Sequence, residues 1–251
     1  MRGLLLSLAL CLMALPAAAE EIVADLSQTR VSITASFVGS EILVFGAIRR
    51  DADTARPLDV IVTIEGPRQR VTVRRKARVG GIWVNRDAVE IDEAPSFYAV
   101  ATTGPLGRVL SDTEDLRHKI SIPRAIRAVG APSSISDARS FVDALIRIRE
   151  RDGVYRVEEG KVRLLEQTLF STRIELPATL VEGTYRTRIF LTSDRAVVGT
   201  FETSLDVKKV GLERMIYKLA HERPLAYGLL AIFLAAFAGL AAAEISRYLK
   251  S

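Results

Sequence analysis

The residues that could perform chemistry are few, and three of them lie close together. Ser111, Asp112 and His118 supply the side-chain types of a nucleophile, an orienting acid and a general base. A chain of this length offers such a triple by chance, so a solvated surface histidine is the favoured interpretation. The sequence contains no HExxH, CxxC, GxGxxG or GxxxxGK[ST] motif, which argues against zinc, dinucleotide and P-loop nucleotide sites.

The acids in the same stretch have a structural explanation. Asp112, Glu114 and Asp115 could hold a cation loosely, but they lack the glycine and the terminal glutamate of a calcium loop. Carboxylates at the start of a helix complement its dipole, and we predict a helix start here. We therefore predict no metal, no other cofactor and no enzymatic activity. The alternative is an exported hydrolase or a binding protein for a small oxyanion.

The strongest chemical signal is a basic run over 68–78, which holds six cations and no acid. In an extended strand, alternation places most of these cations on one face and small apolar residues on the other, with Arg75 as the exception. The predicted anion-binding or partner-binding residues are Arg68, Arg70, Arg74, Lys76 and Arg78. One interpretation is an edge strand that its cations keep soluble. The other is a docking surface for lipid headgroups, an acidic partner or an oxyanion.

The element that decides where these residues act is the uncharged run 225–243. As a helix it spans roughly 28 Å, close to the hydrocarbon thickness of a bilayer. Pro224 suits the first helical turn, because its missing N–H would have no partner there. A buried helix of a soluble core is the alternative, although such helices seldom stay uncharged for this length. We predict a single transmembrane helix.

Small residues recur every four positions within this run. They are the predicted helix-packing residues: Ala231, Ala235, Gly239 and Ala243. Such a stripe lets a second helix approach closely, so a permease subunit or a second copy of the chain is a predicted partner within the membrane. An ordinary alanine-rich helix that faces lipid is the equally weighted alternative.

The N-terminus predicts export. Arg2 precedes the short apolar run 4–15, and Ala17, Ala18 and Ala19 form a cleavage site, as in a secretory signal. Cys11, the only cysteine, lies within this signal, so the mature chain has neither disulfides nor cysteine metal ligands. With 35 basic and 30 acidic residues the chain is no polycation, and we expect no nucleic-acid partner outside the cytoplasm.

Export at one end and a membrane helix at the other define a topology. We expect a bacterial inner-membrane protein with a single span, a periplasmic bulk and a cytoplasmic C-terminus. The predicted segments are a signal peptide over 1–19, an N-terminal β-sandwich region over 20–103, a connector with an amphipathic helix over 104–153, a C-terminal β region over 154–209, a membrane-proximal segment over 210–223, a transmembrane helix over 224–243 and a cytoplasmic tail over 244–251.

Alternating apolar residues predict strands through most of the exported region. The expected strands are 30–37, 41–48, 58–64, 70–79, 82–84, 97–102, 155–159, 161–165, 169–176, 184–191 and 196–207. Between the two groups, 137–151 is an amphipathic helix that Ser136 or Asp137 caps. The segment 176–185 is similar to a tyrosine corner. We predict a mainly β fold: an immunoglobulin-like antiparallel β-sandwich with an inserted amphipathic helix, plus the C-terminal transmembrane helix. Whether the β regions form one sandwich or two is left open.

Several short segments resemble a family of uncharacterised alphaproteobacterial transmembrane proteins. They are Ala-Asp-Leu-Ser at 24–27, Phe-Val-Gly at 37–39, Phe-Gly-Ala-Ile at 45–48, Val-Thr-Val-Arg-Arg-Lys at 71–76, Gly-Ile-Trp-Val-Asn at 81–85, Ser-Phe-Tyr at 96–98 and Gly-Thr-Tyr at 183–185. The resemblance covers nearly the whole mature chain. It implies a signal peptide, an exported domain and one C-terminal helix, together with association with sulfite-exporter-type permeases. It implies no established activity and no catalytic residues.

Overall fold

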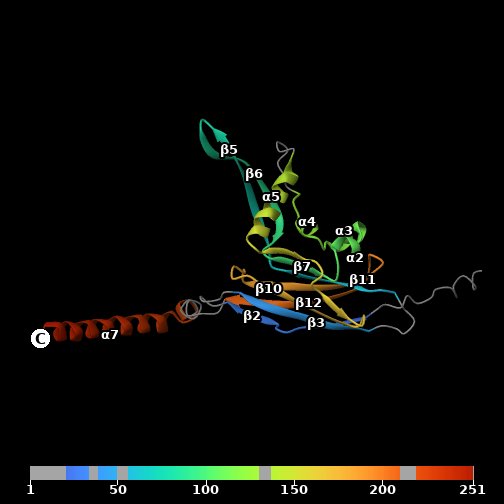
Figure 1. Ribbon diagram of the computed structural model, residues 1–251. Coiled ribbons are helices and arrows are strands. Elements are labelled where there is room, and N and C mark those ends of the chain that lie inside the picture. The colour runs from blue at the N-terminus through green and yellow to red at the C-terminus, as the bar shows by residue number, and fades with distance from the viewer. Residues whose placement is uncertain (1–20, 34–38, 50–55, 130–136, 210–218, 251) are drawn as a thin grey trace, which may run out of the picture. The chain divides into compact units, whose positions relative to one another are not determined.

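The computed structural model describes residues 21–33, 39–49, 56–129, 137–209 and 219–250 (Figure 1). The predicted signal peptide, most of the membrane-proximal segment and the final residue lie outside these ranges. The chain divides into two compact units, one made of Met1–Val31 and Val38–Val207 and the other of Ser32–Phe37 and Lys208–Ser251. The fold is mainly β, with several sheets, one of them curled into a half-barrel.

The first sheet has four strands in the order β1-β3-β10-β9. Their bounds are Glu21–Leu26 for β1, Ser40–Arg49 for β3, Leu169–Leu176 for β10 and Arg163–Leu165 for β9. Every second residue along β10 is buried, including Ile174 and Leu176, and along β3 the buried residues are Ile42, Val44 and Ile48. One face of this sheet therefore belongs to the core, as the alternating sequence predicts.

The second sheet has six strands in the order β2-β12-β11-β4-β7-β8. Their bounds are Arg30–Ile33 for β2, Ala196–Lys209 for β12, Gly183–Ser193 for β11, Asp59–Glu65 for β4, Tyr98–Thr102 for β7 and Tyr155–Glu158 for β8. Every residue of β7 is buried, and so is nearly every residue of β4, which means that the sheet is covered on both faces at its centre. Both sheets combine strands from before and after the connector, so the two predicted β regions share them.

The connector between β7 and β8 is more structured than expected. It forms three short helices, α2 (Leu106–Val109), α3 (Asp112–His118) and α4 (Ile122–Ala125), where the sequence suggested one. They lie on the side of β7 and β11 that faces away from β3 (Figure 1). The Tyr98 hydroxyl donates to the Ile120 carbonyl at 2.8 Å, and the His118 ring meets the edge of Phe190. The connector thus covers the second face of the six-stranded sheet.

The predicted amphipathic helix is confirmed as α5, Ala138–Arg151. Phe141 and Leu145 of its apolar stripe are buried, and Asp137 is its N-cap residue. Together with α2–α4, α5 forms the crossover between β7 and β8, which pair in parallel. The prediction of a purely antiparallel sandwich is wrong at this pair. Parallel neighbours need a long crossover, which the connector supplies, and alternation of apolar residues does not reveal strand direction.

The predicted tyrosine corner has the expected hydrogen bond. Tyr185 is fully buried near the start of β11, and its hydroxyl donates to the Val181 carbonyl at 2.9 Å. Burial raises the pKa of the Tyr185 hydroxyl. The tyrosine therefore remains protonated and closes the turn that precedes β11.

Candidate functional site

The basic run lies on a long two-stranded hairpin, formed by β5 (Arg68–Val79) and β6 (Ile82–Pro95). Figure 1 shows it as one ribbon that extends beyond the sheets, with α5 beside it. Gly80 and Gly81 form the two-residue turn, with φ of 59° and 92°. Two positive φ values suit the turns that match strand twist, and glycine adopts them without strain. The predicted strands 70–79 and 82–84 end and begin at this turn, but the second strand extends to Pro95.

The base of the hairpin is held by a buried carboxylate. The Glu65 side chain is 3% exposed; Arg68 Nε lies 2.5 Å from one of its oxygens and Arg186 Nη2 lies 2.6 Å from the other. Burial alone would raise the pKa of Glu65, but hydrogen bonds from Arg186 and Arg68 outweigh it and lower that pKa. Arg68 also contacts Glu93 at 3.0 Å. The first cation of the predicted docking surface is therefore a structural ion-pair partner.

The middle of the hairpin is neutralised by acids of β6 and α5. Arg70 pairs with Glu90 at 3.0 Å. Arg75 pairs with Asp87 at 2.7 Å and with Asp137 at 2.5 Å, and its guanidinium lies 4.9 Å from the centre of the Phe141 ring. The hydrogen bonds that Arg75 donates, first to Asp137 and then to Asp87, raise the pKa of its guanidinium. Here the hairpin is attached to the start of α5.

The tip of the hairpin differs from both. Lys76 and Arg78 lie between the Arg75–Asp87 pair and the turn; among the described residues Lys76 has no acidic partner, and Arg78 contacts the Gly81 carbonyl at 3.4 Å. Arg74 and Arg86 flank the Arg75–Asp87 pair and also have no acidic partner among the described residues. Large apolar side chains are exposed beside Lys76 and Arg78: Val79 at 52%, Ile82 at 66% and Trp83 at 68%. The cations were predicted from the sequence as binding residues, whereas these apolar residues were not. The signal for them was Val-Gly-Gly-Ile-Trp, in which apolar residues flank a hairpin turn.

The register of the hairpin defines its two faces. Residues directly opposite each other in an antiparallel pair share a face. Arg78 lies opposite Trp83, and Lys76 lies opposite Asn85, whereas Val79 lies opposite Ile82. Register shifts after Gln69 and after Arg75 interrupt the strict pairing. The predicted placement of Arg70, Arg74, Lys76 and Arg78 on one face, with Arg75 on the other, is consistent with this register.

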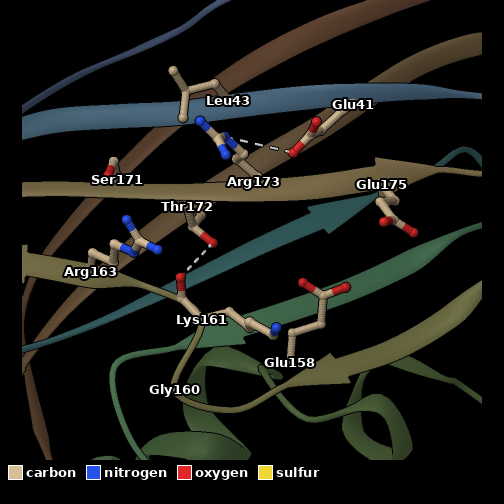
Figure 2. A pocket seen from close by; sticks show the side chains of 10 residues that line it. All are labelled: Glu41, Leu43, Glu158, Gly160, Lys161, Arg163, Ser171, Thr172, Arg173 and Glu175. Carbon is tan, nitrogen blue, oxygen red and sulfur yellow. Dashed lines mark hydrogen bonds and ion pairs between the residues drawn. The ribbon is translucent and has the colours of Figure 1, made fainter.

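A second candidate is a cavity of about 530 Å³ beside β10 and the β8–β9 connection (Figure 2). Three glutamates, one lysine and two arginines line it: Glu41, Glu158, Glu175, Lys161, Arg163 and Arg173. Arg173 approaches Glu41 at 3.7 Å. Burial raises the pKa of Glu158. Because the acids and bases balance, this cavity offers no net positive charge to an oxyanion.

The residues that could form a hydrolytic triad are separated. Ser111 is the N-cap of α3, where its hydroxyl accepts from the Glu114 amide, and His118 is the last residue of that helix. At about 1.5 Å per residue, the two lie roughly 10 Å apart. His118 instead contacts Glu114 at 3.4 Å. The acids of the first turn agree with the predicted helix start, and among the described residues no cluster of three or more metal ligands occurs.

The small-residue stripe lies on α7 (Pro224–Lys250), a helix of 27 residues. Ala231, Ala235 and Gly239 are exposed, while Ala243 lies beyond the side chains that the structure describes. Side chains of α7 are described as far as Leu240, and across the described part of the chain no helix is both long and apolar enough to cross a membrane.

A comparison with protein families gives one match, over residues 21–248, to the family described as "Putative transmembrane protein" (Alph_Pro_TM). The chain belongs to this family. Membership covers the hairpin, both sheets and nearly all of α7, and it agrees with the resemblance seen in the sequence. No curated protein matches the chain. The family description assigns no activity to the hairpin or to the cavity.

Proposed function

We propose that the protein is an exported, membrane-anchored accessory protein without catalytic activity, and that it binds its partner through the tip of the β5–β6 hairpin. The observation that carries this proposal is the contrast along the hairpin. Arg68 at the base and Arg75 in the middle are paired with acids. Lys76 and Arg78, nearer the turn, have no acidic partner among the described residues, and Arg78 lies opposite the exposed Trp83. Exposed apolar residues among unpaired charges are typical of a binding surface.

The location is part of the same proposal: a bacterial inner membrane, with a single span over 224–243, a periplasmic bulk and a cytoplasmic C-terminus. The large apolar side chains of α7 support it, since Leu225, Leu229 and Ile232 are 84%, 70% and 69% exposed. Water disfavours such exposure and lipid does not. The run 225–243 carries no charge in the sequence, and the family description points the same way.

Fusions to a reporter that is active only in the cytoplasm test this topology. The reporter fused after Ser251 should be active, and the same reporter inserted at Gly160, in the turn between β8 and β9, should be inactive. Gly160 suits an insertion because, apart from its two chain neighbours, no residue has an atom within 4 Å of the position of an added Cβ. Activity at Gly160 would contradict the periplasmic placement.

Within the membrane, we propose that α7 contacts a permease subunit or a second copy of the chain through its small residues. A Gly239→Ile substitution blocks close helix approach and preserves hydrophobicity, whereas Phe237→Ile leaves the small-residue face unchanged. An in-membrane association assay of the full chain should show reduced association for Gly239→Ile only. If Gly239→Ile associates as well as the parent does, the proposed contact through the small residues is refuted, and the role left to α7 is that of a membrane anchor.

The immunoglobulin-like relationship of the sheets is also proposed. Its support is the Tyr185 hydroxyl bond to Val181, a hallmark of such sandwiches. The parallel β7–β8 pair departs from the usual immunoglobulin arrangement. An oxyanion-binding or hydrolytic function is not carried forward, because the charges of the cavity beside β10 balance and the Ser111 and His118 side chains do not meet.

A further inference from the structure

The tip of the β5–β6 hairpin has one fully apolar face. By the pairing register, Val79 lies opposite Ile82 and Ala77 lies opposite Val84, and these four residues alternate with the cations of the other face. Further down the same face, Val89 and Ile91 are fully buried. The Arg75–Asp87 ion pair lies between these two apolar stretches of the same face. Beyond that pair, at the tip, Val79 and Ile82 are more than half exposed.

The opposite face combines cations with the only tryptophan of the chain. Trp83 pairs with Arg78, and Lys76 pairs with Asn85. Tryptophan is enriched where membrane meets water, because its ring is apolar and its N–H is polar. Arginine and lysine beside an anionic leaflet gain electrostatic attraction. The two faces together give the tip the composition of an interfacial membrane-binding element.

From this arrangement we propose that the hairpin tip inserts into the headgroup region of an anionic lipid bilayer. The apolar face enters the boundary with the acyl chains, and Arg74, Lys76, Arg78 and Arg86 contact lipid phosphates. The anionic bilayer is thus the partner that the tip binds in the proposed function. This proposal rests on that function, because it requires α7 to hold the chain at a membrane.

The geometry also limits how deep the tip can go. A two-stranded ribbon leaves outward-facing N–H and C=O groups on both strands without a strand partner, and the hydrocarbon core would not satisfy them. At headgroup depth water still reaches these groups. The two glycines add no side chain at the turn, and apart from their chain neighbours no residue has an atom within 4 Å of a Cβ added at Gly80 or Gly81. β5 alone extends roughly 40 Å, so the tip can reach a surface away from its base.

A solubility role for the cations explains less. Exposed cations do protect strand edges from pairing. Solubility gives no reason, however, to expose Ile82 and Trp83 at about two-thirds of their surface in the same turn. An acidic protein partner would also attract the cations, and it is the competing outcome of the experiment below.

Trp83 makes the test direct, because it is the only tryptophan and its emission reports on the tip alone. The full mature chain is reconstituted in nanodiscs of unlabelled phosphatidylcholine. Vesicles with brominated acyl chains are then added, either of phosphatidylcholine alone or with phosphatidylglycerol. A parallel sample places brominated lipid in the nanodisc itself. We expect a blue shift and quenching of Trp83 by phosphatidylglycerol-containing brominated lipid, in the added vesicles or in the nanodisc.

Matched variants separate charge from apolar contact. Arg74→Glu with Lys76→Glu should weaken vesicle binding roughly 25-fold or more, because each cation near an anionic leaflet contributes about fivefold. The control, Arg139→Glu with Arg147→Glu on the exposed face of α5, makes the same change in net charge and should bind nearly as the parent does. Ile82→Ser should reduce quenching, whereas Val198→Ser, at an exposed aliphatic residue outside the hairpin, should not.

The outcomes are distinct. Trp83 emission that is unaffected by every brominated lipid overturns the proposal. Shielding of Trp83 in native membranes, without quenching in any lipid sample, also overturns it and assigns the tip to a protein partner. Carbonate extraction of the same samples tests the anchor. If the chain resists extraction while Trp83 stays unquenched, membrane insertion of the tip is refuted and the proposed anchoring by α7 is retained. If the chain is extracted while Trp83 is quenched, anchoring by α7 is refuted and insertion of the tip is retained.

Discussion

The base and the tip of the β5–β6 hairpin use the same residue type in opposite ways. At the base, Arg68 and Arg186 bind Glu65, whose side chain is almost fully buried. At the tip, Arg78 has no acidic partner among the described residues, and it lies opposite the exposed Trp83. The difference is the presence of a buried acid, which converts a cation from a free charge into part of the fold.

This comparison explains why a run of cations does not by itself identify a binding surface. A buried carboxylate left without its cations is costly, so the base must stay paired. Cations in solvent contribute little to the stability of the fold, so the cations of the tip are available for binding. Function is therefore assigned to those cations of the run whose charge no acid neutralises.

The largest effect is expected when the base loses its cations. Arg68→Met with Arg186→Met leaves Glu65 buried and unpaired, and should lower the free energy of unfolding by about 2–3 kcal/mol at pH 7. This is less than the roughly 3–5 kcal/mol of a fully buried pair, because the Arg68 and Arg186 side chains are 31% and 41% exposed and water screens them. Urea unfolding of the full chain measures the change. A loss below about 1 kcal/mol would mean that the base is no different from the tip.

Lowering the pH should reduce the difference in the free energy of unfolding between the parent and the Arg68→Met, Arg186→Met double variant. In the parent the pKa of Glu65 is lowered, so its pairing stabilises the fold above the ordinary carboxyl pKa, and this contribution is lost as the pH falls through the lowered pKa. In the double variant, burial without cations raises the pKa of Glu65, so protonation relieves the penalty as the pH falls. Urea unfolding at pH 7 and at about pH 4 should give a smaller difference at the lower pH. A constant difference would show that Glu65 is not responsible.

A smaller and local effect is expected at the turn. Gly81→Val places a β-branched residue at a φ of 92°, which strains the turn by about 1–3 kcal/mol. Since the tip has no buried core, hydrogen exchange of the amides beside the turn should accelerate while the urea midpoint stays unchanged. Gly80→Asn, at a φ that asparagine tolerates, serves as the control. A shift of the global midpoint would show that the tip contributes to the core.

The smallest effect on stability is expected when the hairpin loses cations that have no acidic partner among the described residues. Arg74→Met with Arg78→Met matches the base variant in residue type and number, yet it should change the free energy of unfolding by less than about 0.5 kcal/mol. Urea unfolding beside the base variant makes the comparison. A loss similar to that of the base variant would remove the distinction between the two ends of the hairpin.

The sequence predicted most of the strands, α5 and the hydrogen bond of the tyrosine corner, because alternation, amphipathicity and turn residues are local signals. It missed β1 and most of β6. It did not predict the parallel β7–β8 pair or the sharing of sheets between the two β regions, since these depend on contacts between distant residues. The same limit applies to the site. The cation run was visible, but Glu65 and Asp137 neutralise Arg68 and Arg75 from outside it.

The most direct test compares the two ends of the hairpin in a membrane. The mature chain is predicted to lack cysteine, so single spin labels can be placed at Ile82→Cys in the tip and at Gln69→Cys in the base. In vesicles that contain phosphatidylglycerol, collisions with oxygen should exceed those with a water-soluble nickel complex at the tip, and the reverse should hold at the base. Greater access of the nickel complex than of oxygen at both positions would contradict the assignment of the tip to the membrane.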